Sequence, residues 1–344
     1  MNKKYINPKV QRLHNNSVLV TLANREYIDQ AKQLFSSAYW NAGWQGDYLL
    51  LAHEIPEKDL KWFRDKGIKI YKCRPLWKEK IYGHMNTAVL SKFYLFKPYF
   101  KRWKTIVYID ADIIIKASLE KLIEKPTLPG FSAVMDDYTK LKINFHSNAY
   151  KELSRRYNLD KGGFNSGFLV INTRIINKKM FNDLKDFISR DYPRIRMEDQ
   201  AILNMYFYDK WKRLPMLYNV LMNTTHSNYL LDTTKVRGII IHFAYKPKQW
   251  DKKNKFYAEW KNNLRLAEDI DLKARKEPSK IWRDREIIVY TAYLKIRFSI
   301  VKVYTIMNNQ IDKLKEAIRR MLYSIGRVIK RISPKLYFTL GGKN

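Results

Sequence analysis

Two aspartates, Asp110 and Asp112, stand one residue apart at the end of the β-forming run 105–109 (TIVYI). Two carboxylates at this spacing can both reach a single divalent cation, and hard cations such as Mn²⁺ and Mg²⁺ prefer oxygen ligands. Phosphate oxygens and water would complete the coordination of such a cation. An Asp-x-Asp pair also arises by chance, with one aspartate capping a turn and the other exposed to solvent. The pair alone therefore leaves a metal site and a surface turn as alternatives.

The elements around this pair are those of an α/β fold with a mainly parallel sheet. Short apolar runs predict strands at 17–23, 47–52, 68–71, 105–109, 131–135, 168–172 and 238–243. Helices are predicted at 27–40, 58–65 and 87–96, and a further helix begins near residue 197. Alternating strands and helices are typical of sheets that bind their ligands beyond the carboxyl ends of the strands. Both aspartates follow such an end.

The composition is that of a folded and strongly basic protein. The 344 residues include 66 Lys and Arg against 33 Asp and Glu, a formal net charge of +33. Because 46% of the residues are hydrophobic, wholesale disorder is excluded. The charge predicts an anionic partner, which could be a phosphate donor, a lipid surface or a nucleic acid. Cys73 is the only cysteine, which excludes a disulfide framework and favours a reducing compartment.

Signals for export or for spanning a membrane are weak in this sequence. No stretch approaches ~20 uninterrupted apolar residues, the length a spanning helix needs. The apolar run 18–23 follows a basic start but is too short for the core of a signal peptide. We therefore expect a cytoplasmic protein.

Several separated segments resemble glycosyltransferase family 8, which includes glycogenin and bacterial galactosyl- and glucosyltransferases. The region LSKFYLFKPYFKRWKTIVYIDADIII resembles the donor-site segment of that family. In the family's order, the other similar segments are TLANREY (21–27), SKF (91–93), FNSGFLVINT (164–173), EDQAILN (198–204) and HFAYKPKQW (242–250). The resemblance implies a GT-A type fold, a nucleotide-binding domain over residues 17–268, and transfer of a hexose from a UDP-sugar to an acceptor hydroxyl with retention of anomeric configuration.

The resemblance also implies how the departing diphosphate is neutralised. Asp110, Asp112 and His242 would hold Mn²⁺ or Mg²⁺, and Lys248 would lie on the diphosphate as a point charge. Ala111, between the aspartates, would line the donor site. A histidine at such a position is otherwise a core or capping residue, and Lys248 is otherwise one more surface lysine of a lysine-rich loop.

Further residues are assigned to the donor by the same resemblance. The nucleoside would contact Leu22, Ala23, Asn24 and Tyr27, and the hexose would contact Lys92, Asn165, Ser166 and one of Asp136 and Asp137. The resemblance places the catalytic residues Asp199 and Gln200 at the anomeric carbon, with Asp199 binding sugar hydroxyls and Gln200 opposite the leaving group. Tyr27 could instead be a core aromatic, and Asp199 and Gln200 could instead cap a helix. No carboxylate base is identified.

Three positions depart from the family pattern. Tyr245 stands where many relatives have a glycine, and Gln249 precedes Trp250 where relatives often have a proline. Arg196 stands near a position that is acidic in some relatives. The closed form of the 242–250 loop and the choice of sugar are therefore the least predictable features of the site.

Residues 269–344 form a distinct segment with 18 Lys and Arg against 7 Asp and Glu. Apolar residues recur there at helical spacing, at Ile311, Leu314, Ile318, Met321, Leu322, Ile325, Val328, Ile329 and Ile332. Pro334 then ends the pattern. We expect a basic amphipathic helix that binds the anionic inner face of a membrane, the alternative being that its apolar stripe packs on the catalytic domain.

A membrane-bound enzyme of this kind would act on a lipid-linked glycan, such as a lipopolysaccharide or capsule precursor, with glucose or galactose as the transferred sugar. One alternative acceptor is a protein, including the chain itself. A nucleic-acid-binding protein would also explain the charge, but no RNA-recognition, zinc-finger or helix-turn-helix signature is present, so no specific nucleic acid is expected. The sequence carries no signal for an oligomeric state.

Overall fold

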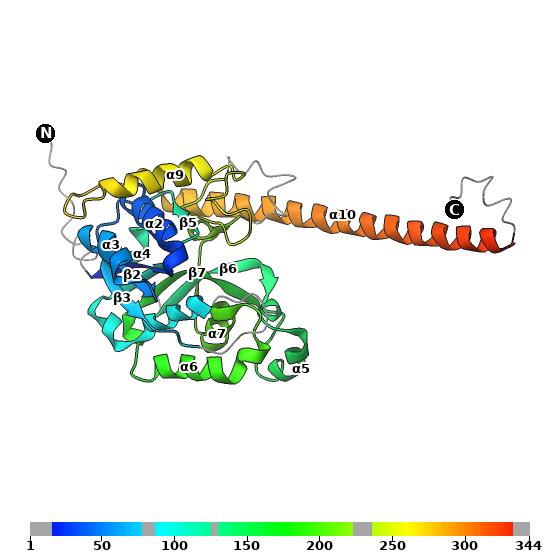
Figure 1. The fold of residues 1–344 in the computed structure, drawn as a ribbon, viewed down its shortest axis with the longest axis horizontal. Coiled ribbons are helices and arrows are strands. Elements are labelled where there is room, and N and C mark those ends of the chain that lie inside the picture. The colour runs from blue at the N-terminus through cyan, green and yellow to red at the C-terminus, as the bar shows by residue number, and fades with distance from the viewer. Residues whose placement is uncertain (1–15, 78–86, 125–129, 223–235, 333–344) are drawn as a thin grey trace. The chain divides into compact units, whose positions relative to one another are not determined.

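The computed structural model describes residues 16–77, 87–124, 130–222 and 236–332. Its centre is a seven-stranded sheet with the order β3-β2-β1-β4-β7-β6-β8, shown in Figure 1. The strands of this sheet are β1 (Ser17–Ala23), β2 (Asp47–His53), β3 (Lys69–Cys73), β4 (Thr105–Ile109), β6 (Phe131–Lys140), β7 (Gly162–Asn172) and β8 (Lys212–Leu214). The order is not sequential, so the chain crosses over the sheet several times.

The sheet is mainly parallel, as the sequence predicts. Strands β3, β2, β1 and β4 run parallel to one another, and β8 runs parallel to β6. Strand β7 is antiparallel to both of its neighbours, β4 and β6. The near-continuous apolar runs of β1 and β2 are almost entirely buried, which is typical of parallel strands with both faces covered.

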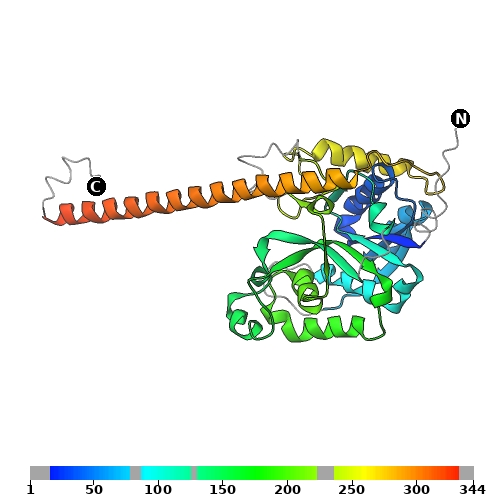
Figure 2. The ribbon, with the colours of Figure 1, turned by 180° about the vertical axis from the view of Figure 1, so that it is seen from behind.

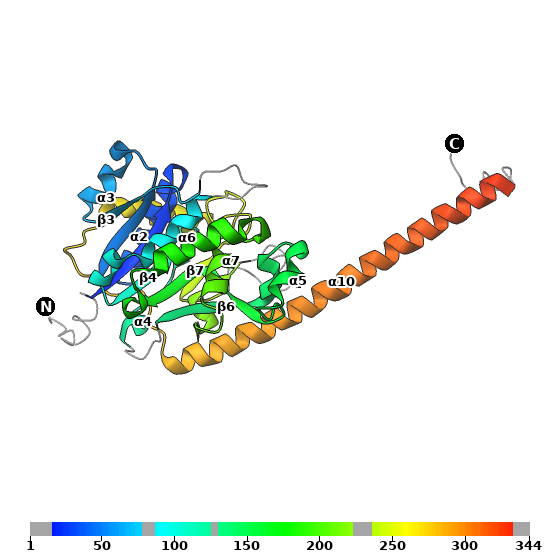
Figure 3. The same cartoon turned by 90° about the horizontal axis from the view of Figure 1, so that it is seen from below.

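Helices cover both faces of this sheet. Figures 1 and 2 show α2 (Ile28–Trp40) and α9 (Tyr257–Leu266) on one side, and α6 (Met180–Asp191) and α7 (Glu198–Tyr206) on the other. Seen from below in Figure 3, α6 and α7 cross in front of the middle strands. The remaining short helices are α3 (Lys61–Asp65), α4 (Lys121–Glu124) and α5 (Tyr150–Leu153).

A second sheet has three short strands in the order β5-β10-β9. They are β5 (Ile113–Ile115), β9 (Val220–Leu221) and β10 (Ile240–His242). Strand β10 is antiparallel to β5 and parallel to β9, and His242 lies opposite Ile113. The last residue of β10 is thereby brought next to the residues that follow β4.

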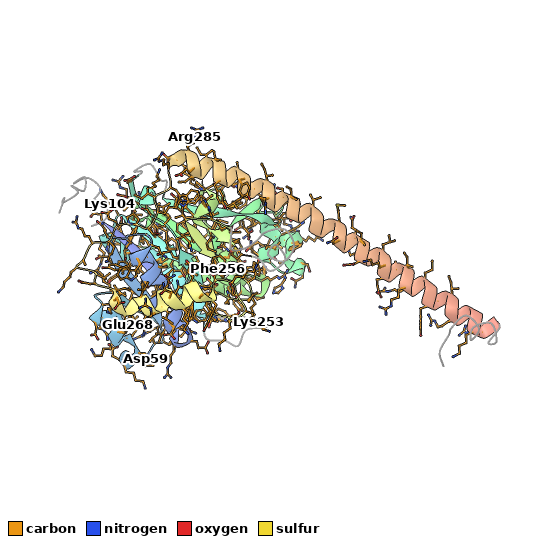
Figure 4. The ribbon with its side chains drawn as sticks, turned by 90° about the horizontal axis from the view of Figure 1, so that it is seen from above. Asp59, Lys104, Lys253, Phe256, Glu268 and Arg285 are labelled. Atoms are coloured by element: carbon orange, nitrogen blue, oxygen red, sulfur yellow. The ribbon has the colours of Figure 1, made fainter. Side chains whose placement is uncertain are left out.

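Two elements differ from the sequence-based expectation. The segment Thr87–Phe96 is a 3-10 helix rather than an α-helix, and eight of its ten residues are buried. Helix α9 is not among the helices that the sequence predicts. Figure 4 labels Phe256, just before α9, whose ring contacts Phe243 with a 5.2 Å centroid separation. Such contacts anchor α9 to the sheet.

The last described element is α10 (Asp284–Ile332), a helix of 49 residues. Residues up to 222 and from 236 to 291 belong to one compact unit, and residues 292–332 to a second. Within the second unit, exposed apolar side chains recur along the helix at Tyr293, Ile296, Ile300, Val303, Met307, Ile311, Leu314, Ile318, Met321 and Ile325. Among the described residues, no helix combines the length and the apolar character needed to cross a bilayer.

Candidate active site

A pocket of about 370 Å³ opens beyond the carboxyl ends of β1 and β4. Most of the side chains that the sequence assigns to a donor site line it: Leu22, Ala23, Asn24, Tyr27, Asp110, Ala111, Asp112, Asn165, Ser166, Asp199, Gln200, His242 and Lys248. Lys92 and Asp136 are buried and lie outside this lining. Asp137 belongs to β6, and its side chain is outside the described part of the structure.

Asp110, Asp112 and His242 come together at one end of the pocket. Asp110 follows β4, Asp112 precedes β5, and His242 ends β10. One ligand atom from each residue lies within 4.8 Å of the others, and among the described residues no other group of this kind occurs. Two carboxylates and one imidazole form a donor set that can hold a divalent cation.

The contacts of these three residues fit a bound cation. Asp112 Oδ1 is buried without a hydrogen-bond donor, and it lies 3.2 Å from His242 Nε2. Asp110 Oδ1 accepts a hydrogen bond of 2.5 Å from the Tyr108 hydroxyl. Burial, reinforced by Asp110, raises the pKa of Tyr108 well above its usual value, so the phenol stays neutral and donates. A cation among these atoms would satisfy the unpaired carboxylate oxygen.

The two aspartates have pKa values shifted in opposite directions. Burial alone would raise the pKa of Asp112, but His242 and Lys248 outweigh it and lower that pKa below its usual range. Burial raises the pKa of Asp110, although the Lys92 ammonium opposes this effect. A lysine therefore contacts each aspartate: Lys92 lies beside Asp110, and Lys248 lies beside Asp112.

Lys248 lies beside Asp112 in the segment that follows β10. Its ammonium donates to Asp112 Oδ2 over 2.6 Å and to the carbonyl oxygens of Phe243 and Ala244 over 2.7 and 3.1 Å. Trp250, two residues further on, makes an edge contact with Tyr27 at a centroid distance of 5.8 Å. The 242–250 segment thus closes against the first loop, and Lys248 is directed into the pocket.

Lys92 supports the pocket wall from behind. Its side chain is 1% exposed, and its ammonium donates to Asp199 Oδ2 over 2.6 Å and to the Ser166 carbonyl over 3.0 Å. Asp110 Oδ1 lies 3.3 Å from the same ammonium. Burial lowers the pKa of Lys92, but the two carboxylates outweigh this and raise it above its usual value. Lys92 therefore stays charged and fixes both carboxylates.

Gly167 permits the close approach of strand β7 to the metal ligands. Its carbonyl accepts a 2.8 Å hydrogen bond from the Asp110 backbone N–H. A Cβ atom at this position would lie 2.4 Å from His242 Cε1 and 2.9 Å from Asp110 Oδ2. No side chain fits in that space, which explains why this position of β7 requires glycine.

Asp199 and Gln200 lie in the first turn of α7. Gln200 Oε1 accepts hydrogen bonds from Asn165 Nδ2 (3.1 Å) and from the Ser166 N–H (3.2 Å). Gln200 Nε2 donates to Asn144 Oδ1 over 3.0 Å. Helix α7 begins with Glu198 at a φ of 23°, a conformation that a residue with a side chain rarely adopts. Such strain is common at functional sites.

The remaining predicted residues lie at two places. Asn24 and the 3-10 helix Arg25–Tyr27 follow β1, and burial raises the pKa of Tyr27, which stays a neutral phenol. Asp136 is 6% exposed and close enough to the Tyr245 side chain to raise its pKa together with burial. Tyr245 itself is 41% exposed.

Among the residues of the site that were not predicted are Tyr108, Asn144 and Asn219. Tyr108 could have been found, because residues two apart on a strand point to the same face and Tyr108 precedes Asp110 by two. Asn219 contacts both His242 and Asn165. No local pattern marks Asn144 or Asn219, since their partners are distant in sequence.

Comparisons with known proteins agree with this geometry. The sequence model of Glycosyl transferase family 8 matches residues 18–254. Glycosyltransferase GlyA of Streptococcus pneumoniae is 25% identical over 242 residues, which are 67% of this chain and 32% of that protein. Lipopolysaccharide 1,2-glucosyltransferase of Escherichia coli is 28% identical over 160 residues, 43% of this chain and 45% of that protein. The chain thus spans a third to a half of the length of these relatives.

Solved structures share the fold. The galactosyltransferase LgtC, in complex with donor and acceptor sugar analogs, has a TM-score of 0.57 at 15% identity, with 78% of this chain and 98% of LgtC covered. At this identity the likeness establishes the GT-A type fold that the sequence predicts.

Proposed function

The chain belongs to glycosyltransferase family 8, and we propose that it transfers a hexose from a UDP-sugar to a saccharide acceptor with retention of anomeric configuration, in a reaction that depends on a divalent metal. The observation that carries this proposal is the meeting of Asp110, Asp112 and His242 in one pocket beside Lys248. Glucose and galactose are the sugars we expect, in keeping with the names of the relatives.

The chemistry requires charge stabilisation on the leaving diphosphate. A cation held by Asp110, Asp112 and His242 would supply part of it as a Lewis acid. Lys248 is positioned to supply a second positive charge, and because its ammonium is held at three points it needs little reorganisation. Asp199 and Gln200 line the same pocket, where they would face the sugar.

We assign the hexose to the side of the pocket formed by Asn165, Ser166 and α7. Ser166 and Asp199 are both buried and are both held by Lys92. Polar groups with fixed orientation can select among sugar epimers, because a misplaced hydroxyl leaves a buried partner unsatisfied. This side of the pocket would therefore determine which UDP-hexose is accepted.

The acceptor that we propose is a lipid-linked glycan at the cytoplasmic face of a membrane, with the enzyme bound peripherally through α10. Residues 292–332 of this helix carry the exposed apolar stripe described above. On the rest of residues 311–332, the basic side chains are Lys313, Lys315, Arg319, Arg320, Arg327, Lys330 and Arg331, against Asp312 and Glu316. Anionic lipid headgroups complement these flanks, whereas a second copy of the helix would bring like charges together.

The test is a screen of UDP-sugar hydrolysis and transfer with Mn²⁺. UDP-glucose, UDP-galactose and their N-acetyl forms would be compared, each with and without EDTA, using the Asp112→Ala variant as control. We expect turnover of one UDP-hexose that EDTA and Asp112→Ala both abolish. Incorporation of labelled hexose into the polypeptide would indicate a protein acceptor instead. No turnover with any sugar, together with salt-sensitive retention on DNA or RNA, would overturn the proposal.

A further inference from the structure

We propose, on the basis of the function proposed above, that a directional chain of side-chain amides joins His242 to Gln200 and sets the tautomer of the histidine. Asn219 and Asn144 are then positioning residues of the active site. The chain runs from His242 through Asn219, Asn165 and Gln200 to Asn144. The successive bonds are 2.9, 2.8, 3.1 and 3.0 Å.

The direction of this chain is set by backbone groups that can only donate or only accept. The Gly167 N–H donates to Asn165 Oδ1 over 3.0 Å, and the Ser166 N–H donates to Gln200 Oε1 over 3.2 Å. At the far end, the Leu141 carbonyl accepts from Asn144 Nδ2 over 2.9 Å. Each of these contacts identifies which end of the amide is oxygen and which is nitrogen.

The orientation of Asn219 follows from that of Asn165. Because Asn165 presents its oxygen, Asn219 must present its nitrogen to it, and the bond measures 2.8 Å. The oxygen of Asn219 then faces His242 Nδ1 at 2.9 Å. Turning the Asn219 amide over would place two oxygens face to face on one side, and Asn219 is 2% exposed, so the conflict could not be relieved by bulk water.

An oxygen opposite Nδ1 requires that this nitrogen carry the proton. The lone pair of the neutral ring is then on Nε2, which lies 3.2 Å from Asp112 Oδ1. Two acceptors facing one another at this distance suit a cation between them, and metal-binding histidines commonly donate from their other nitrogen to a fixed oxygen. Asn219 therefore prepares His242 as a ligand before any cation binds.

The same chain orients Gln200. Its oxygen faces residues 165–167 of β7, and its nitrogen faces Asn144. Asn144 is 2% exposed and donates onward to the backbone, so its own orientation is determined. The backbone N–H groups of Ser166 and Gly167 thus orient side chains on the metal side and on the sugar side of the pocket together.

The direct test is the tautomer of His242 in the metal-free, full-length protein. The chain has six histidines, so ¹⁵N-histidine labelling with a His242→Gln spectrum for assignment would identify the resonances. In the neutral form of the ring we expect the proton on Nδ1 and the lone pair on Nε2. A neutral ring with its proton on Nε2 in the wild-type protein would overturn the proposal without any variant being needed.

Two variants separate the contribution of Asn219 from the general effect of a substitution. In Asn219→Leu we expect loss of the single tautomer and a 10- to 100-fold weaker Mn²⁺ affinity, measured by electron paramagnetic resonance of free Mn²⁺. In Asn219→Asp, which still offers an oxygen to Nδ1 but no longer donates to Asn165, we expect the neutral ring to keep its proton on Nδ1. The control is Asn263→Leu, which replaces a buried asparagine of α9 that does not line the pocket. Wild-type tautomer and affinity in Asn219→Leu would overturn the proposal.

Failure of the enzymatic function would give a different result. If the chain is not a UDP-hexose transferase, the histidine tautomer and the effect of Asn219→Leu on it would still be as described, but no UDP-sugar would turn over. The two outcomes are therefore distinguishable.

Discussion

The ammonium of Lys92 lies 2.6 Å from Asp199 Oδ2, and both side chains are buried. The same ammonium lies 3.3 Å from Asp110 Oδ1. One lysine therefore joins a carboxylate of the metal site to a carboxylate on the sugar side of the pocket. This relationship has direct consequences for stability, because removing one partner of a buried ion pair leaves the other charge uncompensated.

Lys92→Met should lower the free energy of unfolding by roughly 3–5 kcal/mol at neutral pH, as measured by urea denaturation. The variant loses the cation that opposes the effect of burial on Asp110, so the folded-state pKa of this carboxyl rises further. The folded state then binds more protons than the unfolded state, and the stability deficit should be larger at about pH 8 than at about pH 5. Lys61→Met, which breaks an exposed pair with Asp65, is the control and should change little. Equal losses at both pH values would contradict the proposed role.

Asp112→Ala should abolish Mn²⁺-dependent turnover, by a factor of at least about 10³, while the fold survives. Asp112 stands between two strands, so circular dichroism should show a retained fold, with some loss of thermal stability because the ion pair with Lys248 is broken. Unchanged turnover in a folded variant would remove Asp112 from the site.

Gly167→Ala should weaken Mn²⁺ binding and turnover together, because the added methyl group would displace His242 or Asp110. Displacements of about 1 Å at a catalytic group can cost about 10²-fold in rate. The matched control is Gly162→Ala in the same strand, where the nearest atom to an added Cβ is the flexible Met135 Sδ at 3.1 Å. Metal titration of both variants would show whether the effect is specific to position 167.

Leu314→Gln, Ile318→Gln and Met321→Gln combined should reduce binding to anionic vesicles at least about tenfold, because they remove apolar area and leave the charge unchanged. The control is Tyr323→Gln, which also leaves the charge unchanged and replaces an exposed apolar side chain away from the stripe. Co-sedimentation of the full-length protein is the measurement. Deletion from residue 271 is less informative, since it would also remove the buried Trp282 and Ile287. Wild-type binding by the triple variant, or a dimer in place of a vesicle-bound monomer, would exclude the membrane surface as the partner of α10.

Cys73 should be inert toward thiol reagents in the native protein. Burial raises its pKa to about 12, so its thiolate fraction at about pH 8 is roughly 10³-fold below that of an ordinary cysteine. Reaction with a disulfide reagent should be correspondingly slow and should become rapid in guanidinium. Since this is the only cysteine, its rate of reaction in the folded protein reports global unfolding, provided that β3 does not open locally. Rapid labelling of the folded chain would show that β3 opens locally.

The sequence predicted the site best where candidate metal ligands directly follow a predicted strand. The runs 17–23 and 105–109 are observed as β1 and β4 with the same bounds, because continuous apolar β-formers of this length have few other ways to be buried. Asp110 and Asp112 then necessarily lie at the carboxyl end of β4. Family resemblance contributed the distant partner, His242, which no local pattern connects to the aspartates.

Other features depended on contacts that the sequence does not encode locally. The segment 87–96 has helical spacing, but this spacing does not reveal that the segment forms a 3-10 helix. Asn219 and Asn144 act through Asn165 and Gln200, which are 54 and 56 residues away from them. Nothing in the sequence around Lys92 indicates that it is buried. Its charge is compensated in the interior by the carboxylates of Asp110 and Asp199.

Asp110 follows a strand of the seven-stranded sheet, whereas Asp112 and His242 flank strands of the three-stranded one. Because the ligands come from both sheets, the affinity for a cation depends on the relative position of the two sheets. A substitution that loosens the packing between the two sheets would lower cation affinity and activity without altering any ligand. Conversely, a cation bound by ligands from both sheets would hold the sheets together and reduce their motion beyond the pocket.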